Sequence, residues 1–153
     1  MKNCSAYWSL VLLFLYYTID RWMPLGRWNG NYHWPVHNDQ FWMDVFVCSA
    51  LVVFIFCFRL NLRAGMIACV ALLSLWVYFH LRVWWLPYFR GVSPRGIAFH
   101  EQFLAKTQIF PRYGNHIPPD AEHTFIDVFV FPAFVLCLIA TVRSFVKSRK
   151  PPA

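Results

Sequence analysis

Four long runs of apolar residues, separated by polar connections, dominate the pattern along the chain. The runs cover about residues 3–19, 41–58, 64–85 and 124–142. A membrane-spanning helix needs about 20 mostly apolar residues, and each run approaches that length with few charges. We therefore predict an all-α fold, an integral membrane bundle of four transmembrane helices with a partly structured extracytoplasmic loop between the third and fourth. Residues 1–153 then form a single four-span membrane domain.

The connections between the runs make further predictions about the helices. The second and third runs are joined only by residues 59–63, which predicts a tight helical hairpin. Proline stops or kinks a helix, so Pro87 is expected to end the third helix and Pro132 to kink the fourth. The first run lacks small residues at its end, which favours an uncleaved signal anchor over a cleaved signal peptide.

Composition supports the membrane assignment. Of all residues, 59% are hydrophobic and 14% are charged, whereas a soluble domain carries about 25% charged residues. The net charge of +7 fits basic residues that flank apolar spans and face anionic lipid headgroups. We therefore expect no nucleic-acid partner. The expected partners are the lipid bilayer and another membrane protein, and the sequence names no cofactor.

The five cysteines carry no sign of a disulfide framework or a zinc site. Four of them, Cys48, Cys57, Cys69 and Cys137, lie inside apolar runs, and no two cysteines form a CxxC pair. Buried cysteine behaves as a small apolar residue. We interpret these four as packing residues.

The distribution of basic residues predicts the orientation. With four spans, both termini share one side, and that side carries Lys2, Arg59, Arg63, Arg143, Lys147, Arg149 and Lys150 without an acidic residue. Short segments rich in Lys and Arg stay in the cytoplasm. We expect cytoplasmic termini in an integral membrane protein of the bacterial inner membrane.

Four ionisable residues lie within the predicted spans: Asp44, His80, Arg82 and Asp127. At 1.5 Å per residue, each is about 22–28 Å along its helix from a cytoplasmic arginine, so all four share one layer near the outer leaflet. One interpretation is structural, with Arg82 paired to Asp44 or Asp127. The other is a polar pocket that opens outward, where an aspartate and His80 exchange protons or hold a ligand.

The segment before the fourth run suggests a second kind of site. His100, His116, Glu122 and His123 are candidate metal ligands, because imidazole and carboxylate groups suit divalent metals. The alternative is that these residues are solvated or cap the fourth helix, with Asp120 as its N-cap. No HExxH motif accompanies them.

Three functional hypotheses remain. The first is a small, non-enzymatic accessory or interaction component of the membrane, favoured by the short chain and by the absence of a catalytic motif. The second is a membrane-embedded enzyme, or a binder of a lipid-like ligand, that uses the Asp44, His80, Arg82 and Asp127 layer. The third is metal handling by the loop histidines. The question of an enzyme stays open, and the sequence leans against one.

The plan of four spans, internal termini and outer acidic residues is similar to that of two groups of membrane proteins. One is the emopamil-binding superfamily of small sterol-isomerase-like proteins, and the other is the bacterial four-span immunity proteins that act against pore-forming toxins. Both resemblances rest on span count and charge placement over the whole chain. They imply an all-α membrane fold and transfer no functional residue to this sequence.

Overall fold

A computed structural model describes residues 3–25, 41–101 and 107–148, and within these ranges the chain is helical, with no β-strand. The elements in chain order are α1 (Cys4–Trp22), α2 (Phe41–Leu60), α3 (Arg63–His80), the π-helix η2 (Leu81–Trp85), α4 (Leu86–Arg90), α5 (Pro94–Phe99) and α6 (Ala121–Ser148). The all-α class predicted from the hydrophobic pattern is confirmed.

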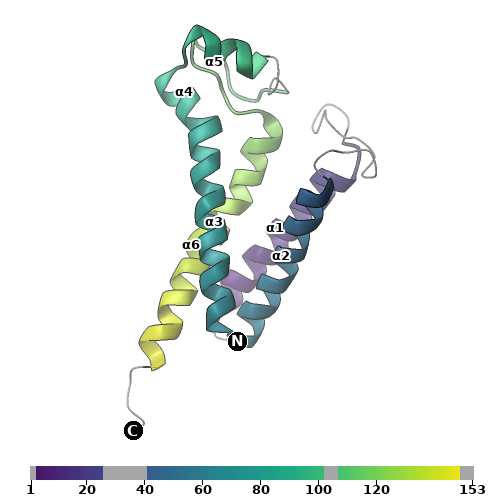
Figure 1. The fold of residues 1–153 in the computed structure, drawn as a ribbon, viewed down its shortest axis with the longest axis vertical. Helices are drawn as coiled ribbons and strands as arrows, with labels where there is room; N and C mark the ends of the chain where they lie inside the picture. The colour runs from purple at the N-terminus through teal and green to yellow at the C-terminus, as the bar shows by residue number, and fades with distance from the viewer. Residues whose placement is uncertain (1–2, 26–40, 102–106, 149–153) are drawn as a thin grey trace.

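The long helices α1, α2, α3 and α6 alternate in direction (Figure 1). The start of α1, the turn between α2 and α3 and the end of α6 lie at one end of the molecule (Figure 1). The helices α4 and α5 lie at the other end, together with the segment that leads into α6. We call residues 86–101 and 107–120 the cap, because they lie beyond α3 and α6 at this second end (Figure 1).

Apolar residues of all sizes, from Ala6 to Phe58, form the core between the long helices. Leu10 and Leu13 of α1 and Leu73 of α3 are completely buried. Cys69 and Cys137 are buried in the same cluster, which confirms their interpretation as packing residues. All five cysteines are free thiols. Small residues at these positions let the helix axes approach one another closely.

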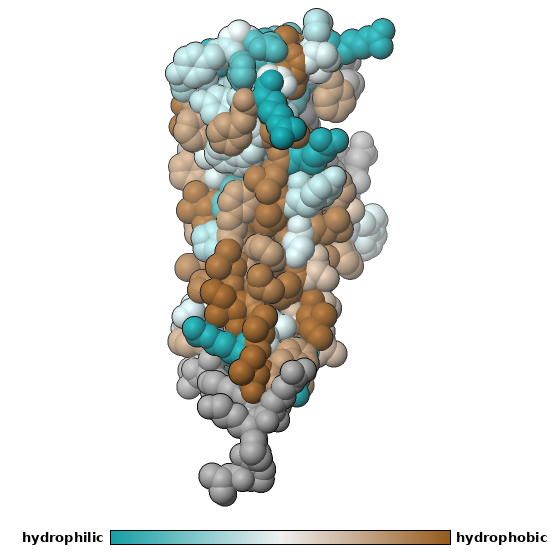
Figure 2. All heavy atoms as spheres, turned by 90° about the vertical axis from the view of Figure 1, so that its left-hand side faces the viewer, coloured by the Kyte–Doolittle hydropathy of each residue, from teal (hydrophilic) through white to brown (hydrophobic). Residues whose placement is uncertain are grey.

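Much of the apolar surface of the long helices points away from the core. The segments Phe41–Leu60, Arg63–Arg90 and Ala121–Val146 are long and apolar enough to cross a membrane, yet only 28%, 22% and 39% of their most apolar windows are buried. On the face shown in Figure 2, apolar side chains cover the middle of the molecule, and hydrophilic side chains gather at the cap end. Exposing such a surface to water is unfavourable, so this is a membrane protein.

The third helix continues through Pro87, and the prediction that it ends there is wrong. α3, η2 and α4 follow one another without a break from Arg63 to Arg90. A proline ring crowds the carbonyl four residues earlier, which is that of Val83. Val83 lies in η2, whose wider π-helical turn leaves room for the ring. The other predicted ends were also too early, because α1 reaches Trp22 and α6 runs through Pro132 to Ser148.

The tight turn between the second and third helices is present as predicted. Asn61 adopts a left-handed conformation with a φ of 57°. The backbone N–H of Leu62 donates to the carbonyl oxygen of Cys57 at 2.8 Å, which closes a Schellman-type end to α2. Gly65 then faces Cys57, and a Cβ atom added at position 65 would overlap the Cys57 side chain.

Candidate functional site

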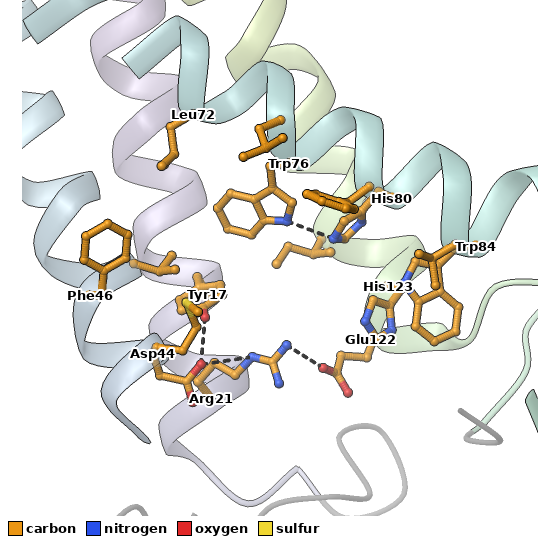
Figure 3. A pocket seen from close by; sticks show the side chains of 16 residues that line it. Tyr17, Arg21, Asp44, Phe46, Leu72, Trp76, His80, Trp84, Glu122 and His123 are labelled. Atoms are coloured by element: carbon orange, nitrogen blue, oxygen red, sulfur yellow. Dashed lines mark hydrogen bonds and ion pairs between the residues drawn. The ribbon is translucent and has the colours of Figure 1, made fainter. Parts of the chain in front are cut away.

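A cavity of about 720 Å³ lies between the long helices on the side of the cap (Figure 3). Side chains from α1, α2, α3, η2 and α6 line it. Its walls differ in character. One part is apolar and partly exposed at the molecular surface, whereas the other is polar and buried.

The apolar part of the lining forms the entrance. Met43 and Phe46 of α2 border the cavity and are 62% and 57% exposed. Leu75 and Phe79 of α3 and Val83 of η2 border it from the other side and are also exposed. Residues that line a cavity and are also exposed mark its mouth. The cavity therefore opens sideways, between α2 and α3, toward the region where lipid chains would lie.

An arginine at the end of α1 organises the first half of the polar wall. The Arg21 guanidinium lies 3.0 Å from a Glu122 oxygen, and its Nε lies 3.9 Å from Asp44 and 3.7 Å from Asp20. The hydroxyl of Tyr17 donates to the same Asp44 oxygen at 2.7 Å. Figure 3 shows Arg21 reaching from Asp44 to Glu122 along one side of the cavity. One guanidinium thus serves carboxylates from three helices.

A hydrogen-bonded chain through His80 forms the second half. The indole N–H of Trp76 donates to His80 Nε2 at 2.8 Å. His80 Nε2 is therefore the acceptor nitrogen, and Nδ1 carries the proton that it donates to Asp127 at 2.6 Å. The second Asp127 oxygen accepts from Trp85 Nε1, also at 2.6 Å. Asp127 fixes the tautomer of a histidine whose Nε2 lies on the cavity side.

The first turn of α6 closes the polar wall at the cap. Asp120 caps the helix, because its carboxylate accepts from the backbone N–H of His123 at 2.8 Å, as the sequence predicts. The same oxygen lies 2.8 Å from His123 Nδ1. The His123 ring stacks on Trp84, with 3.7 Å between centroids. Trp84 belongs to η2, so the π-helical turn takes part in shaping this wall.

The structure brings together three residues of the predicted polar layer. Asp44, His80 and Asp127 lie at the cap end of the long helices, with His80 and Asp127 in direct contact. Arg82 is exposed, and the pairing of Arg82 with either aspartate is not found. The reason is rotation, because successive residues of a helix point in different directions. Trp84 of η2 is buried, whereas Arg82 in the same short turn is not.

Arg21 and Tyr17 take the place that sequence reasoning gave to Arg82. Arg21 was missed because the first span was ended at Ile19, which left Asp20 and Arg21 in a connection. The sequence signal that could have identified Arg21 was the acidic and basic pair Asp20–Arg21 directly after the first apolar run. Such a pair can stay within the helix and turn inward at the membrane boundary.

The metal-ligand candidates do not converge. His116 Nδ1 lies 2.8 Å from the backbone carbonyl oxygen of Tyr88. His100 packs edge-on against Trp84, whereas Glu122 and His123 are engaged with Arg21 and Asp120. No group of three His, Cys, Asp or Glu side chains suited to a metal ion occurs in the described ranges.

Comparison with known proteins adds no assignment. No protein-family model matches the chain, and no curated protein or solved structure shows significant similarity to it. The two resemblances based on span count therefore carry no argument about function. The proposal about function is therefore based on the geometry of the cavity.

Proposed function

We propose that the protein is a four-span membrane protein that binds a membrane-resident amphiphile in the lateral cavity. The observation that carries this proposal is the division of the cavity wall. Its mouth between α2 and α3 is apolar, and its interior presents Arg21, Asp44, His80 and Glu122. An apolar chain would lie in the mouth, and a polar head would reach the inner wall.

The exposed surface of α1 supports the proposal that α1 is a fourth membrane-spanning helix, in addition to α2, α3 and α6. Its Tyr and Trp residues and the Asp20–Arg21 pair make it less apolar than the other three long helices. Nevertheless, Trp8, Leu12, Leu15 and Ile19 are exposed to between 45% and 53%. Their spacing of three and four residues puts them on one face. Lipid is the environment in which such an apolar face is stable.

The orientation proposed from the sequence fits this arrangement. Arg59 and Arg63 flank the turn between α2 and α3, and Arg63 donates to the backbone carbonyl oxygen of Ser144 at 3.2 Å, next to Arg143 on α6. The positive-inside rule then puts this end, with both termini, in the cytoplasm. The cap and the cavity would lie toward the outer leaflet of a bacterial inner membrane.

The cavity favours the hypothesis of a ligand binder over the hypothesis of a non-enzymatic accessory component, which the sequence alone put first. An accessory component that acts through helix packing would need no enclosed polar wall. A ligand binder needs one, because buried polar groups without a task are costly. No feature of the described residues favours metal handling.

The Asp127–His80 pair favours acid–base catalysis as a second candidate function. Asp127 holds His80 with Nδ1 protonated, which leaves the Nε2 lone pair on the cavity side, where Trp76 donates to it. A bound ligand that displaced this indole would meet a base. In an enzyme, His80→Gln should change the co-purified compound from product to substrate. Identical compounds in both proteins would exclude turnover by His80.

Native mass spectrometry of the protein released from a neutral detergent tests the binding function. The wild type should retain an amphiphile in stoichiometric amount. Leu75→Trp should lower its occupancy severalfold, because a larger side chain at position 75 narrows the mouth. Leu12→Trp is the matched control, since Leu12 is similarly exposed and lies away from the cavity lining. A wild type without bound amphiphile, or equal occupancy in both variants, would refute the proposal.

A further inference from the structure

We infer that the head group of the bound amphiphile carries a hydroxyl, as a lipid alcohol does. This inference rests on the proposed function and specifies its ligand. It is drawn from two neighbouring groups of the cavity wall, the Asp44 carboxylate and the Arg21 guanidinium. Each of them keeps hydrogen-bonding capacity that the described residues do not use. The proposal that the cavity binds an amphiphile does not depend on this detail.

Asp44 has one carboxylate oxygen without a hydrogen-bond partner among the described residues. The side chain borders the cavity, and the residue is only 4% exposed. Its Oδ1 accepts from the Tyr17 hydroxyl at 2.7 Å and lies 3.9 Å from Arg21 Nε. Oδ2 forms no hydrogen bond within the described ranges. An enclosed carboxylate oxygen without a partner is costly, so this position favours a ligand that donates a hydrogen bond.

Arg21 offers the complementary donors. Its Nη2 lies 3.0 Å from a Glu122 oxygen, and its buried Nε has no hydrogen-bond partner among the described residues. Nη1 forms no hydrogen bond with a described residue either. A guanidinium carries five N–H donors in a rigid fork. Because Arg21 borders the cavity, its terminal Nη1 can donate to an oxygen atom of a bound head group.

The two groups lie next to each other on the inner wall (Figure 3). The 3.9 Å between Arg21 Nε and Asp44 Oδ1 is too long for a hydrogen bond, so the pair is not closed on itself. A hydroxyl has one O–H donor and two acceptor lone pairs. A single hydroxyl can therefore donate to Asp44 Oδ2 and accept from Arg21, and it is the smallest neutral group that does both.

The opposite charges of Asp44 and Arg21 argue against a charged head group. A phosphate or carboxylate beside Arg21 would also meet the Asp44 carboxylate, and an ammonium beside Asp44 would also meet the guanidinium. Like charges held close together repel strongly where water is excluded. An uncharged hydroxyl avoids both repulsions. The cavity would therefore select a lipid alcohol over the charged phospholipids of the surrounding bilayer.

Dodecyl probes with different head groups test the inference. Dodecanol donates and accepts, dodecyl methyl ether only accepts, and dodecyltrimethylammonium and laurate are charged. Each is added to the protein in a maltoside detergent over the same series of mole fractions in the micelle. Native mass spectrometry near neutral pH measures the occupancy. We expect dodecanol to bind about tenfold more tightly than the ether, which cannot donate to Asp44, and more tightly than either charged probe.

Two variants of the wall separate donation from acceptance. Asp44→Asn keeps an oxygen that accepts from Tyr17 and replaces Oδ2 by an NH2 group, so dodecanol should bind at most about twofold more tightly than the ether. Arg21→Lys keeps the charge but loses the fork of donors, so both probes should bind severalfold more weakly. Glu101→Gln is the matched control for loss of an acid, because Glu101 pairs with Arg112 in the cap and its side chain is 58% exposed. If one wall variant fails to fold, the other variant and the wild-type probe series still decide.

Each outcome of the probe series has a distinct meaning. Equal binding of dodecanol and the ether to the wild type would overturn the inference, because water would then satisfy Asp44. Tightest binding by laurate or by the ammonium probe would overturn it too. In both cases the cavity still binds an amphiphile, and the proposed function stands.

Binding of none of the probes, together with a wild type that retains no amphiphile, would refute both the inference and the proposed function. If the wild type retains a native amphiphile that no probe displaces, the head group of that compound decides. A hydroxyl in its head group would support the inference, and a head group without one would overturn it.

Discussion

At the scale of single residues, the contrast between Asp127 and Asp44 shows how a buried carboxylate is held. Asp127 accepts from His80 on one oxygen and from Trp85 on the other. The described partners of Asp44, Tyr17 and Arg21, both approach its Oδ1. An amide has one acceptor oxygen and one donor nitrogen. The two aspartates should therefore respond differently to the same replacement by asparagine.

We predict that Asp127→Asn destabilises the protein by about 1–3 kcal/mol, because its NH2 group must face an N–H donor. Asp44→Asn should cost less, since the asparagine oxygen can still accept from Tyr17. Thermal unfolding in detergent, followed by circular dichroism, measures both. Equal destabilisation by the two variants would contradict the hydrogen-bond arrangement described for Asp127.

The sequence predicted some of these residues and not others. Asp44, His80 and Asp127 were found from their depth in the predicted spans, because depth follows from counting residues along a helix. Whether two side chains face each other depends on helix rotation, which counting does not give. For that reason the sequence left open a pairing of Arg82 with an aspartate, whereas Arg21 was overlooked because the first span was ended at Ile19.

At the scale of elements, the contact between α2 and α3 near their turn is unusually close. A Cβ atom added at Gly65 would lie 2.8 Å from Cys57 Cβ and would also meet Cys57 Sγ. Both residues are held in place by the turn through Asn61. A side chain at position 65 would therefore push the two helices apart.

We predict that Gly65→Ala lowers the free energy of unfolding by about 1–3 kcal/mol, the usual effect of overpacking. Adding Cys57→Gly in the same chain removes the atoms that the new Cβ would meet. The double variant should regain stability relative to its Cys57→Gly parent. A double variant as unstable as the sum of both single changes would show that the helices do not meet here.

The cap provides a prediction about pH. Burial lowers the pKa of His100, which packs against Trp84 and borders a small hollow with Glu101, Arg112 and Asp120. The folded state therefore binds a proton less readily than the unfolded chain, whose histidine pKa is about 6.5. The stability contributed by neutral His100 is present above that pH and is lost as the pH falls.

The midpoint temperature of unfolding should accordingly decrease as the pH is lowered from about 7 to about 5. His100→Gln should reduce this dependence on pH. His116→Gln serves as the control, because His116 bonds to a backbone carbonyl in the same cap. A pH dependence unchanged by His100→Gln would mean that other groups cause it.

Hydropathy predicted the existence of the elements but not their ends. Helices α2 and α3 coincide closely with the expected runs, because lipid exposure demands continuous apolar sequence. The π-helical turn before Pro87 could not be foreseen, since residues 81–85 carry no local signal for it. That turn accompanies the burial of Trp84 and the exposure of Arg82.

At the scale of the whole molecule, the number of spans depends on α1. If α1 crosses the membrane, Cys4 and the cap lie on opposite sides of it. If α1 does not cross, the start of the chain lies on the same side as the cap. Cys4 is exposed, whereas Cys57, Cys69 and Cys137 are buried. Chemical labelling of Cys4 in the native chain can therefore report the side of the membrane on which α1 begins.

We predict that a membrane-impermeant maleimide labels Cys4 in inverted inner-membrane vesicles and not in intact spheroplasts. Arg95→Cys, an exposed position of α5, should show the reverse pattern when tested with Cys4→Ser in the same chain. Cys4→Ser alone is the control for reaction at Cys48, which is partly exposed. Labelling of both positions from the same side would show that α1 does not cross the membrane. In that case lipid would not surround the apolar face of α1. This one comparison therefore distinguishes the three-span arrangement from the four-span arrangement.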